Sequence, residues 1–117
     1  METLLKKIND LNKMIVEGNA LEGFEKYYHE NVVMQENEST PTIGKNANRE
    51  RERKFLDDVT DFRVANVLSV ASGDHVTMVE WYFDYTHKDW GIRNYKQISV
   101  QHWADDKIIN EKFYYES

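Results

Sequence analysis

The sequence has 117 residues, which is room for a single domain, and we expect one domain over residues 1–117. Its formal net charge of −6 argues against a nucleic-acid partner, and the lack of cysteine excludes disulfides and thiolate chemistry. No apolar run approaches the roughly 20 residues of a membrane span, and no secretory signal is evident. We therefore expect a cytoplasmic protein without a membrane partner.

The first segment predicts a helical hairpin. Thr3 is a suitable N-cap for a helix whose apolar residues recur every three or four positions, and Gly18 is suited to end it. Asn19 then begins a second helix, with Glu22 placed as its capping-box partner.

A short strand is predicted over residues 32–36, followed by a loop over residues 37–44 that contains the only proline. A third helix is predicted over residues 45–56, with Ala47 among its few core residues. Its charge run, residues 48–54, alternates in sign and is typical of a solvated helical face laced with ion pairs.

From Val59 onward the apolar period changes from helical to two, which predicts four long strands joined by short turns. The turns are expected at residues 72–74, 87–91 and 105–106. Consecutive strands joined in this way form an antiparallel meander. Helices followed by a sheet indicate an α+β domain, with the helices laid on one face of the sheet.

This order of elements resembles the nuclear transport factor 2-like fold and, within it, the SnoaL-like group, which includes ketosteroid isomerases and polyketide cyclases. Two segments carry the resemblance: residues 39–45, leading into the third helix, and the closing hairpin at residues 102–109 with residues 113–116 after it. The resemblance implies a cone-shaped, curved antiparallel sheet around a pocket that the N-terminal helix hairpin and the third helix cap. It also implies a homodimer formed through the convex face of the sheet.

The resemblance to ketosteroid isomerases places the role of the carboxylate base on Gln35 and the role of the protonated carboxyl on Gln101. A glutamine side chain cannot take up a proton at neutral pH, so it cannot act as a general base. An amide can still donate a hydrogen bond, which leaves Gln101 an oxyanion-stabilising role. The isomerase chemistry is therefore not expected to carry over.

The candidate proton carriers that remain are Glu36 and His102. Glu36 should face away from Gln35 unless a bulge turns it inward. His102 is the histidine that lies within a strand, and a free imidazole titrates near neutral pH. Glu80 is expected to point away from the pocket, and Glu111 cannot be assigned a face without the hairpin register. The histidine spacings signal no metal site, and no cofactor is implied.

Large side chains alternate along one face of a predicted strand, and the resemblance places this face toward the interior. They make either a solid core or an aromatic-walled pocket for a flat, mostly apolar ligand. With residues of the same parity on the next strand, the expected ligand-binding set is Gln35, Val79, Trp81, Phe83, Tyr85, Tyr95, Gln101 and Trp103.

One point of strand register stays open. Ile98 and Val100 have parity opposite to Gln101. Either the convex face is buried by a partner, with Tyr82 extending the apolar patch, or the register is wrong by one residue and His102 faces the pocket.

The leading hypothesis is a SnoaL-like domain that binds a small apolar molecule and has no catalytic acid–base pair. The first alternative is an isomerase, cyclase or dehydratase that uses His102 or Glu36 for proton transfer. The second alternative is a non-catalytic dimerisation module.

Overall fold

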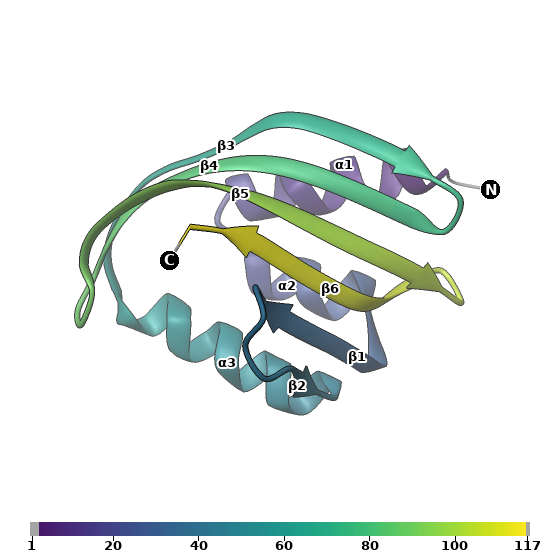
Figure 1. The fold of residues 1–117 in the computed structure, drawn as a ribbon, viewed down its shortest axis with the longest axis horizontal. Helices are drawn as coiled ribbons and strands as arrows, with labels where there is room; N and C mark the ends of the chain where they lie inside the picture. The colour runs from purple at the N-terminus through teal and green to yellow at the C-terminus, as the bar shows by residue number, and fades with distance from the viewer. Residues whose placement is uncertain (1–2, 117) are drawn as a thin grey trace.

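The computed structural model describes residues 3–116, which contain three helices and six strands (Figure 1). In chain order they are α1 (Leu4–Val16), α2 (Ala20–Tyr27), β1 (Tyr28–Glu36), β2 (Thr42–Ile43), α3 (Lys45–Asp58), β3 (Val59–Gly73), β4 (Val76–His87), β5 (Gly91–Ala104) and β6 (Lys107–Tyr115).

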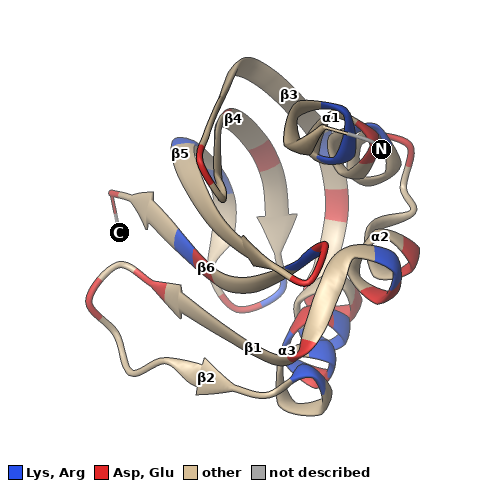
Figure 2. Cartoon of the chain, turned by 90° about the vertical axis from the view of Figure 1, so that its right-hand side faces the viewer, with Lys and Arg blue, Asp and Glu red and all other residues tan. Residues whose placement is uncertain are grey.

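The six strands form one curved sheet in the order β2-β1-β6-β5-β4-β3. Strands β3 to β6 form the predicted antiparallel meander, and the three helices lie on the same side of the sheet (Figure 2). The α+β class and the cone shape are thereby confirmed. The sheet is nevertheless mixed, because β1 runs parallel to β6. These two strands are distant in sequence, so no hairpin forces them to be antiparallel.

The helical hairpin forms as predicted. The Thr3 hydroxyl accepts a hydrogen bond from the backbone N–H of Lys6 at 3.1 Å, and Gly18, with φ +85°, ends the turn after α1. The two helices are close, since a Cβ on Gly23 would stand 2.8 Å from a methyl group of Leu11. The expected capping box does not form: Asn19 precedes α2, but its side chain makes no capping hydrogen bond.

Strand β1 begins four residues earlier than predicted, and α3 runs two residues longer. Ala47 is exposed rather than part of the core. The anchor of α3 is instead Asn48, which is 1% exposed and donates hydrogen bonds from Nδ2 to the carbonyls of Val32, Thr42 and Gly44. An amide that satisfies three backbone acceptors takes the place of an apolar contact.

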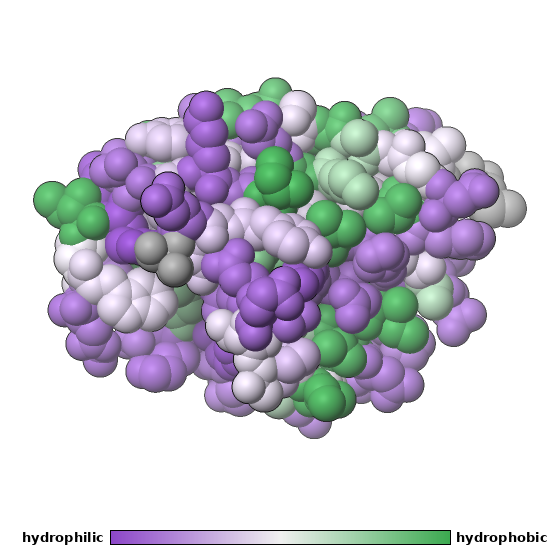
Figure 3. Space-filling model, viewed as in Figure 1, coloured by the Kyte–Doolittle hydropathy of each residue, from purple (hydrophilic) through white to green (hydrophobic). Residues whose placement is uncertain are grey.

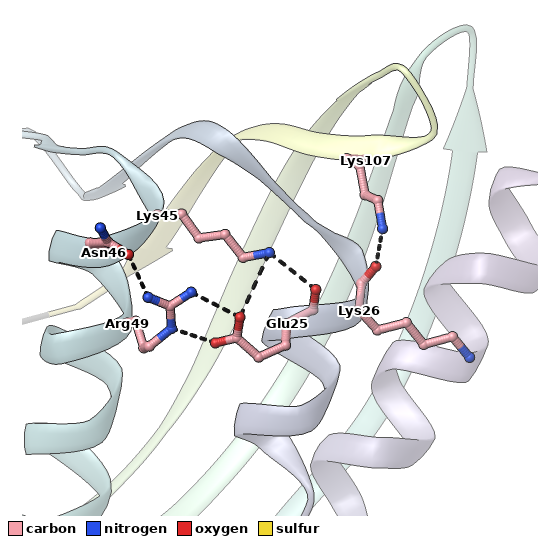
Figure 4. A network of polar contacts seen from close by, with 6 residues as sticks. All are labelled: Glu25, Lys26, Lys45, Asn46, Arg49 and Lys107. Atoms are coloured by element: carbon pink, nitrogen blue, oxygen red, sulfur yellow. Dashed lines mark hydrogen bonds and ion pairs between the residues drawn. The ribbon is translucent and has the colours of Figure 1, made fainter.

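Ion pairs tie the start of α3 to α2 (Figure 4). Arg49 donates to the carboxylate of Glu25, with 2.8 Å between Nη2 and Oε1, and to the side-chain oxygen of Asn46. The buried Lys45 donates to the Glu25 carbonyl at 3.1 Å. Part of the charge run therefore pairs as expected.

The sheet has one buried and one partly apolar, exposed face. Val79, Trp81 and Tyr85 are buried on the inner face, whereas Met78 and Ile98 are about 40% exposed on the outer face. Figure 3 shows apolar side chains scattered among polar ones on this outer side. A homodimer formed through this face stays a prediction. No helix among residues 3–116 has the length and apolar character needed to cross a membrane.

Candidate functional site

A cavity of about 1070 Å³ lies between the inner face of the sheet and the helices. Five of the residues expected at a ligand site line it: Trp81, Phe83, Tyr85, Tyr95 and Gln101. The rings form a continuous wall: Trp81 and Phe83 stack with centroids 5.2 Å apart, and Phe83 and Tyr95 are 6.0 Å apart. The inner face of β4 is therefore both core and cavity wall.

Three residues of the expected set lie elsewhere. Val79 and Trp103 are buried in the hydrophobic core but are not among the residues that line the cavity. Gln35 is turned away from the cavity and donates to the Ser39 carbonyl at 2.9 Å. The role that the resemblance gives to Gln35 therefore finds no counterpart in the lining of this cavity.

Glu36, rather than Gln35, lines the cavity. Its carboxylate is held on both sides. Arg51 donates to Oε2 at 2.6 Å, and the Tyr115 hydroxyl donates to Oε1 at 2.9 Å. The Glu36 carboxylate is therefore held in place at the rim of the cavity by two donors.

His102 is exposed, while Gln101 is 2% exposed and faces the cavity. This settles the register that the sequence left open. Successive side chains of a strand point to opposite faces, so a buried Gln101 requires an outward His102. His102 is therefore placed where it cannot act on a molecule in the cavity.

The most buried carboxylate of the cavity is Glu111 on β6, which is 3% exposed. Its Oε1 accepts a hydrogen bond from the Tyr28 hydroxyl, and its Oε2 accepts one from Nε2 of Gln101 at 2.7 Å. Strand pairing brings Gln101 directly opposite Glu111, and β1 brings Tyr28 to the same end. We call this end of the cavity the inner end.

The direction of the hydrogen bonds follows from one donor. The indole Nε1 of Trp103 can only donate, and it donates to the Thr77 hydroxyl at 2.9 Å. Thr77 in turn donates to Oε1 of Gln101 at 2.7 Å. The amide of Gln101 must then present its NH₂ group to Glu111. The protein thus fixes two donors on the Glu111 carboxylate.

Burial raises the pKa of the Glu111 carboxyl to about 7. The hydrogen bonds from Tyr28 and Gln101 oppose this rise, and the negative charge of Glu52 adds to it. The pKa of the Tyr28 hydroxyl is raised well above its usual range, mainly by burial and also by the Glu111 charge. Glu111 is therefore a carboxyl that can hold or release a proton near neutral pH.

Glu52 lies inside the charge run that was expected to be solvated. Its side chain is half-buried and lines the cavity, and burial raises the pKa of its carboxyl. A helix of this length presents every third or fourth residue to the same side, so one member of the run must face the sheet. The solvated-face prediction is wrong for Glu52.

The sequence left the face of Glu111 open and gave Tyr28 and Glu52 no role at the site. A usable signal existed for Glu111, which shares strand parity with Phe113 and Tyr115, two aromatic residues that also line the cavity. Glu80, in contrast, lies outside the lining as expected and accepts a hydrogen bond from Ser69. Within residues 3–116, no group of three or more metal-binding side chains gathers at one point.

Comparison with known proteins gives a consistent result. The model of the SnoaL-like domain matches residues 10–111. No curated protein sequence gives a match. A Mesorhizobium loti protein provisionally named a SnoaL-like polyketide cyclase superposes with a TM-score of 0.88, with 19% identity, over 97% of this chain and 100% of that chain.

Two other solved structures extend the comparison. An NTF2-like protein of unknown function from Burkholderia pseudomallei has a TM-score of 0.83, with 9% identity, over 99% of this chain and 92% of that chain. An LEH-like epoxide hydrolase from Mycobacterium tuberculosis has a TM-score of 0.76, with 9% identity, over 95% of this chain and 80% of that chain. At these identities the likeness shows a shared fold alone.

Proposed function

This chain belongs to the SnoaL-like domain family, and from that premise we propose that its cavity binds a small, largely apolar molecule. The observation that carries the proposal is the cavity of about 1070 Å³ with a wall of aromatic rings. Ligand sites in proteins have volumes of about 300–1,000 Å³ and combine apolar walls with a few polar groups. The volume of this cavity is close to the upper end of that range, and the rings on β4 and β5 give it an apolar wall, with charged residues around it.

The aromatic wall favours an aromatic ligand. Trp81 and Phe83 stack on each other, with their centroids 5.2 Å apart and an angle of 13° between their planes. An aromatic ligand can pack against such rings in the edge-to-face or offset arrangements that aromatic groups prefer. The polar groups of the inner end, Gln101 and Glu111, would then orient it.

A cavity-filling substitution tests this proposal. Ser99 is 3% exposed and lines the cavity midway along β5, so Ser99→Phe should place a ring in the ligand volume. Binding of planar aromatic compounds, followed by calorimetry and thermal shift, should be lost. His102→Phe, on the outer face of the same strand, is the matched control and should bind as the wild type does. Uniform absence of binding to the wild-type protein would contradict the proposal.

A second candidate function is proton transfer to or from the bound molecule, as in an isomerase or cyclase. The observation that favours it is the Glu111 carboxyl in the cavity, with a pKa of about 7. A general base is most effective when its pKa lies near the working pH. Glu111 replaces His102 and Glu36 as the proton carrier of this hypothesis.

Tyr28 gives Glu111 a route to the ligand. Ionised Glu111 accepts the hydrogen of the Tyr28 hydroxyl. When Glu111 is protonated, its own O–H can donate to the Tyr28 oxygen. The phenolic hydrogen is then free to turn toward the cavity, which Tyr28 also lines. A proton gained at the carboxyl thus makes a hydrogen-bond donor available at the hydroxyl.

Turnover of conjugated ketones tests the second candidate. Glu111→Gln should lower kcat/KM by about a hundredfold or more, because an amide cannot accept the proton. Wild-type kcat/KM should rise with pH through about 7 as Glu111 ionises. Glu80→Gln, on the outer face, is the matched control. Turnover that survives Glu111→Gln would remove Glu111 from the reaction.

A further inference from the structure

Arg93 lies near the start of β5 and lines the cavity far from Glu111. It shares strand parity with Tyr95 and Gln101, so its side chain belongs to the inner face. Its guanidinium carbon lies 5.1 Å from the centroid of the Tyr95 ring. We call this part of the cavity, with Arg93, Tyr95, Tyr115 and the 59% exposed Trp90, the outer end.

The guanidinium of Arg93 has no anionic partner in the part of the chain that the structure describes. The buried Nε of Arg93 makes no hydrogen bond within residues 3–116. The guanidinium as a whole takes part in no ion pair within 4.0 Å among these residues. The other cations that line the cavity are all paired: Arg51 with Glu36, Lys54 with Asp58, and Arg63 with Asp61 and Asp84. Arg93 is therefore the exception among them.

Two carboxylates of the rim, Glu36 and Asp61, are already engaged. Glu36 holds Arg51 and the Tyr115 hydroxyl, as described above. Asp61 lies 3.0 Å from Arg63. A guanidinium that is partly removed from water and lacks a counter-charge is unfavourable, because it has lost hydration without gaining an opposite charge. The contact with the Tyr95 ring supplies no such charge.

We propose that Arg93 forms a carboxylate subsite and that the ligand is an amphipathic organic anion. The planar guanidinium matches a carboxylate with two parallel hydrogen bonds, and the rings beside it receive the apolar body of the same molecule. This inference rests on the proposed function, since it names the class of ligand that the cavity binds.

The subsite is distinct from the inner end. Arg93 and Gln101 are eight positions apart on one strand face, and eight residues of extended strand span about 26 Å at roughly 3.3 Å per residue. This span is well beyond the screening length of about 8 Å at physiological ionic strength, so a carboxylate at Arg93 does not repel Glu111 appreciably. A short ligand occupies the outer end and the aromatic wall, and an elongated one also reaches the Gln101–Glu111 pair.

The test compares two probes that differ in charge and hardly in shape, 2-naphthylacetate and 2-naphthylacetamide, titrated calorimetrically into the full chain at pH 8. Wild-type protein should bind the acid about ten- to a hundredfold more tightly than the amide, as a charge-assisted hydrogen-bond pair provides. Arg93→Gln should abolish this preference and leave the affinity for the amide within about twofold.

Two further variants sharpen the test. Arg63→Gln removes the same charge from a cavity-lining arginine that already has partners, and it should keep the preference. Arg93→Lys should keep part of the preference for the acid, since the positive charge remains while the two parallel N–H donors of the guanidinium are lost. Binding of the neutral probe 2-naphthylacetamide shows, for every variant, that the cavity is still folded.

The outcomes separate the two proposals. Equal affinities for acid and amide in the wild type would overturn the carboxylate subsite and leave binding intact. An equal loss of preference in Arg63→Gln and Arg93→Gln would also overturn it, because a general positive field would then explain the result. Failure of both probes and of all other planar aromatic compounds would overturn the proposed function as well.

Discussion

The two ends of the cavity handle their polar groups in opposite ways. At the inner end, Trp103, Thr77, Gln101 and Glu111 form an unbroken chain of hydrogen bonds, so each group has a partner within the protein. At the outer end, the guanidinium of Arg93 has a buried nitrogen without one. A complete network fixes geometry in the absence of ligand. An unpaired charge indicates where a ligand must contribute, and the comparison therefore yields separate predictions for stability and for binding.

The largest predicted effect concerns Glu111 and pH. Its pKa is raised by burial to about 7, above the ordinary value of 4.5, so the folded protein binds this proton more tightly than the unfolded chain. The stabilisation of the folded state by the protonated Glu111 carboxyl is fully present below pH 4.5. It is lost as pH rises to about 7, and above that pH the Glu111 carboxyl causes no further change in stability. At about 1.4 kcal/mol per pKa unit, the loss is on the order of 3 kcal/mol.

Urea unfolding of wild-type protein and Glu111→Gln at pH 4.5 and pH 8 measures this effect. The wild type should lose more stability than the variant over this interval, because the amide does not titrate. Glu80→Gln, at a half-buried position outside the cavity lining, serves as the control and should follow the wild type. A pH dependence that is the same in wild type and Glu111→Gln would mean that the carboxyl is not desolvated.

A smaller effect is expected for Thr77→Val. The hydroxyl of Thr77 links the Trp103 indole to the Gln101 amide, and the side chain is 0% exposed. Its removal leaves a buried donor and a buried acceptor unpaired, at a cost of about 2–3 kcal/mol in the free energy of unfolding. Thr60→Val, on the exposed start of β3, should change stability by less than about 0.5 kcal/mol. Equal effects at the two sites would show that the inner network contributes no stability.

The smallest effect is expected for Arg93→Gln. Because its guanidinium makes no ion pair in residues 3–116, its replacement should leave stability unchanged or raise it by about 0.5 kcal/mol. Arg63→Gln breaks ion pairs with Asp61 and Asp84 and should lower stability by about 0.5–1 kcal/mol. Chemical denaturation without ligand distinguishes the two. A large destabilisation by Arg93→Gln would assign this residue a structural role.

Sequence periodicity predicted the elements whose pattern is set by burial. The helical hairpin follows from apolar spacing and from Gly18, and the meander follows from alternation between short turns. Trp81 and Phe83 face the cavity as the alternation along β4 predicted, whereas the face of Gln101 followed from the resemblance and was left open by the sequence. In these cases local sequence and tertiary structure impose the same pattern.

The predictions that were wrong depended on contacts between distant segments. Glu36 lines the cavity and Gln35 does not, although the resemblance placed the site residue on Gln35. In the sequence, Glu52 is one of many charged residues of the third helix. Only the packing of α3 over the cavity shows that its side chain lines the cavity. Glu111 owes its raised pKa to burial, and its partner Tyr28 is brought near it by the parallel pairing of β1 with β6. No local pattern specifies that pairing.

The central claim, that the cavity is a ligand site, is tested most directly by the three tryptophans. Trp81 and Trp90 line the cavity. Trp103 is not among the lining residues, and its indole N–H is hydrogen-bonded to the Thr77 hydroxyl. In an NMR titration with 2-naphthylacetate, with the indole N–H signals assigned by single Trp→Phe variants, the signals of Trp81 and Trp90 should shift together and that of Trp103 should stay in place. A titration that moves none of them, or moves Trp103 alone, would contradict the claim.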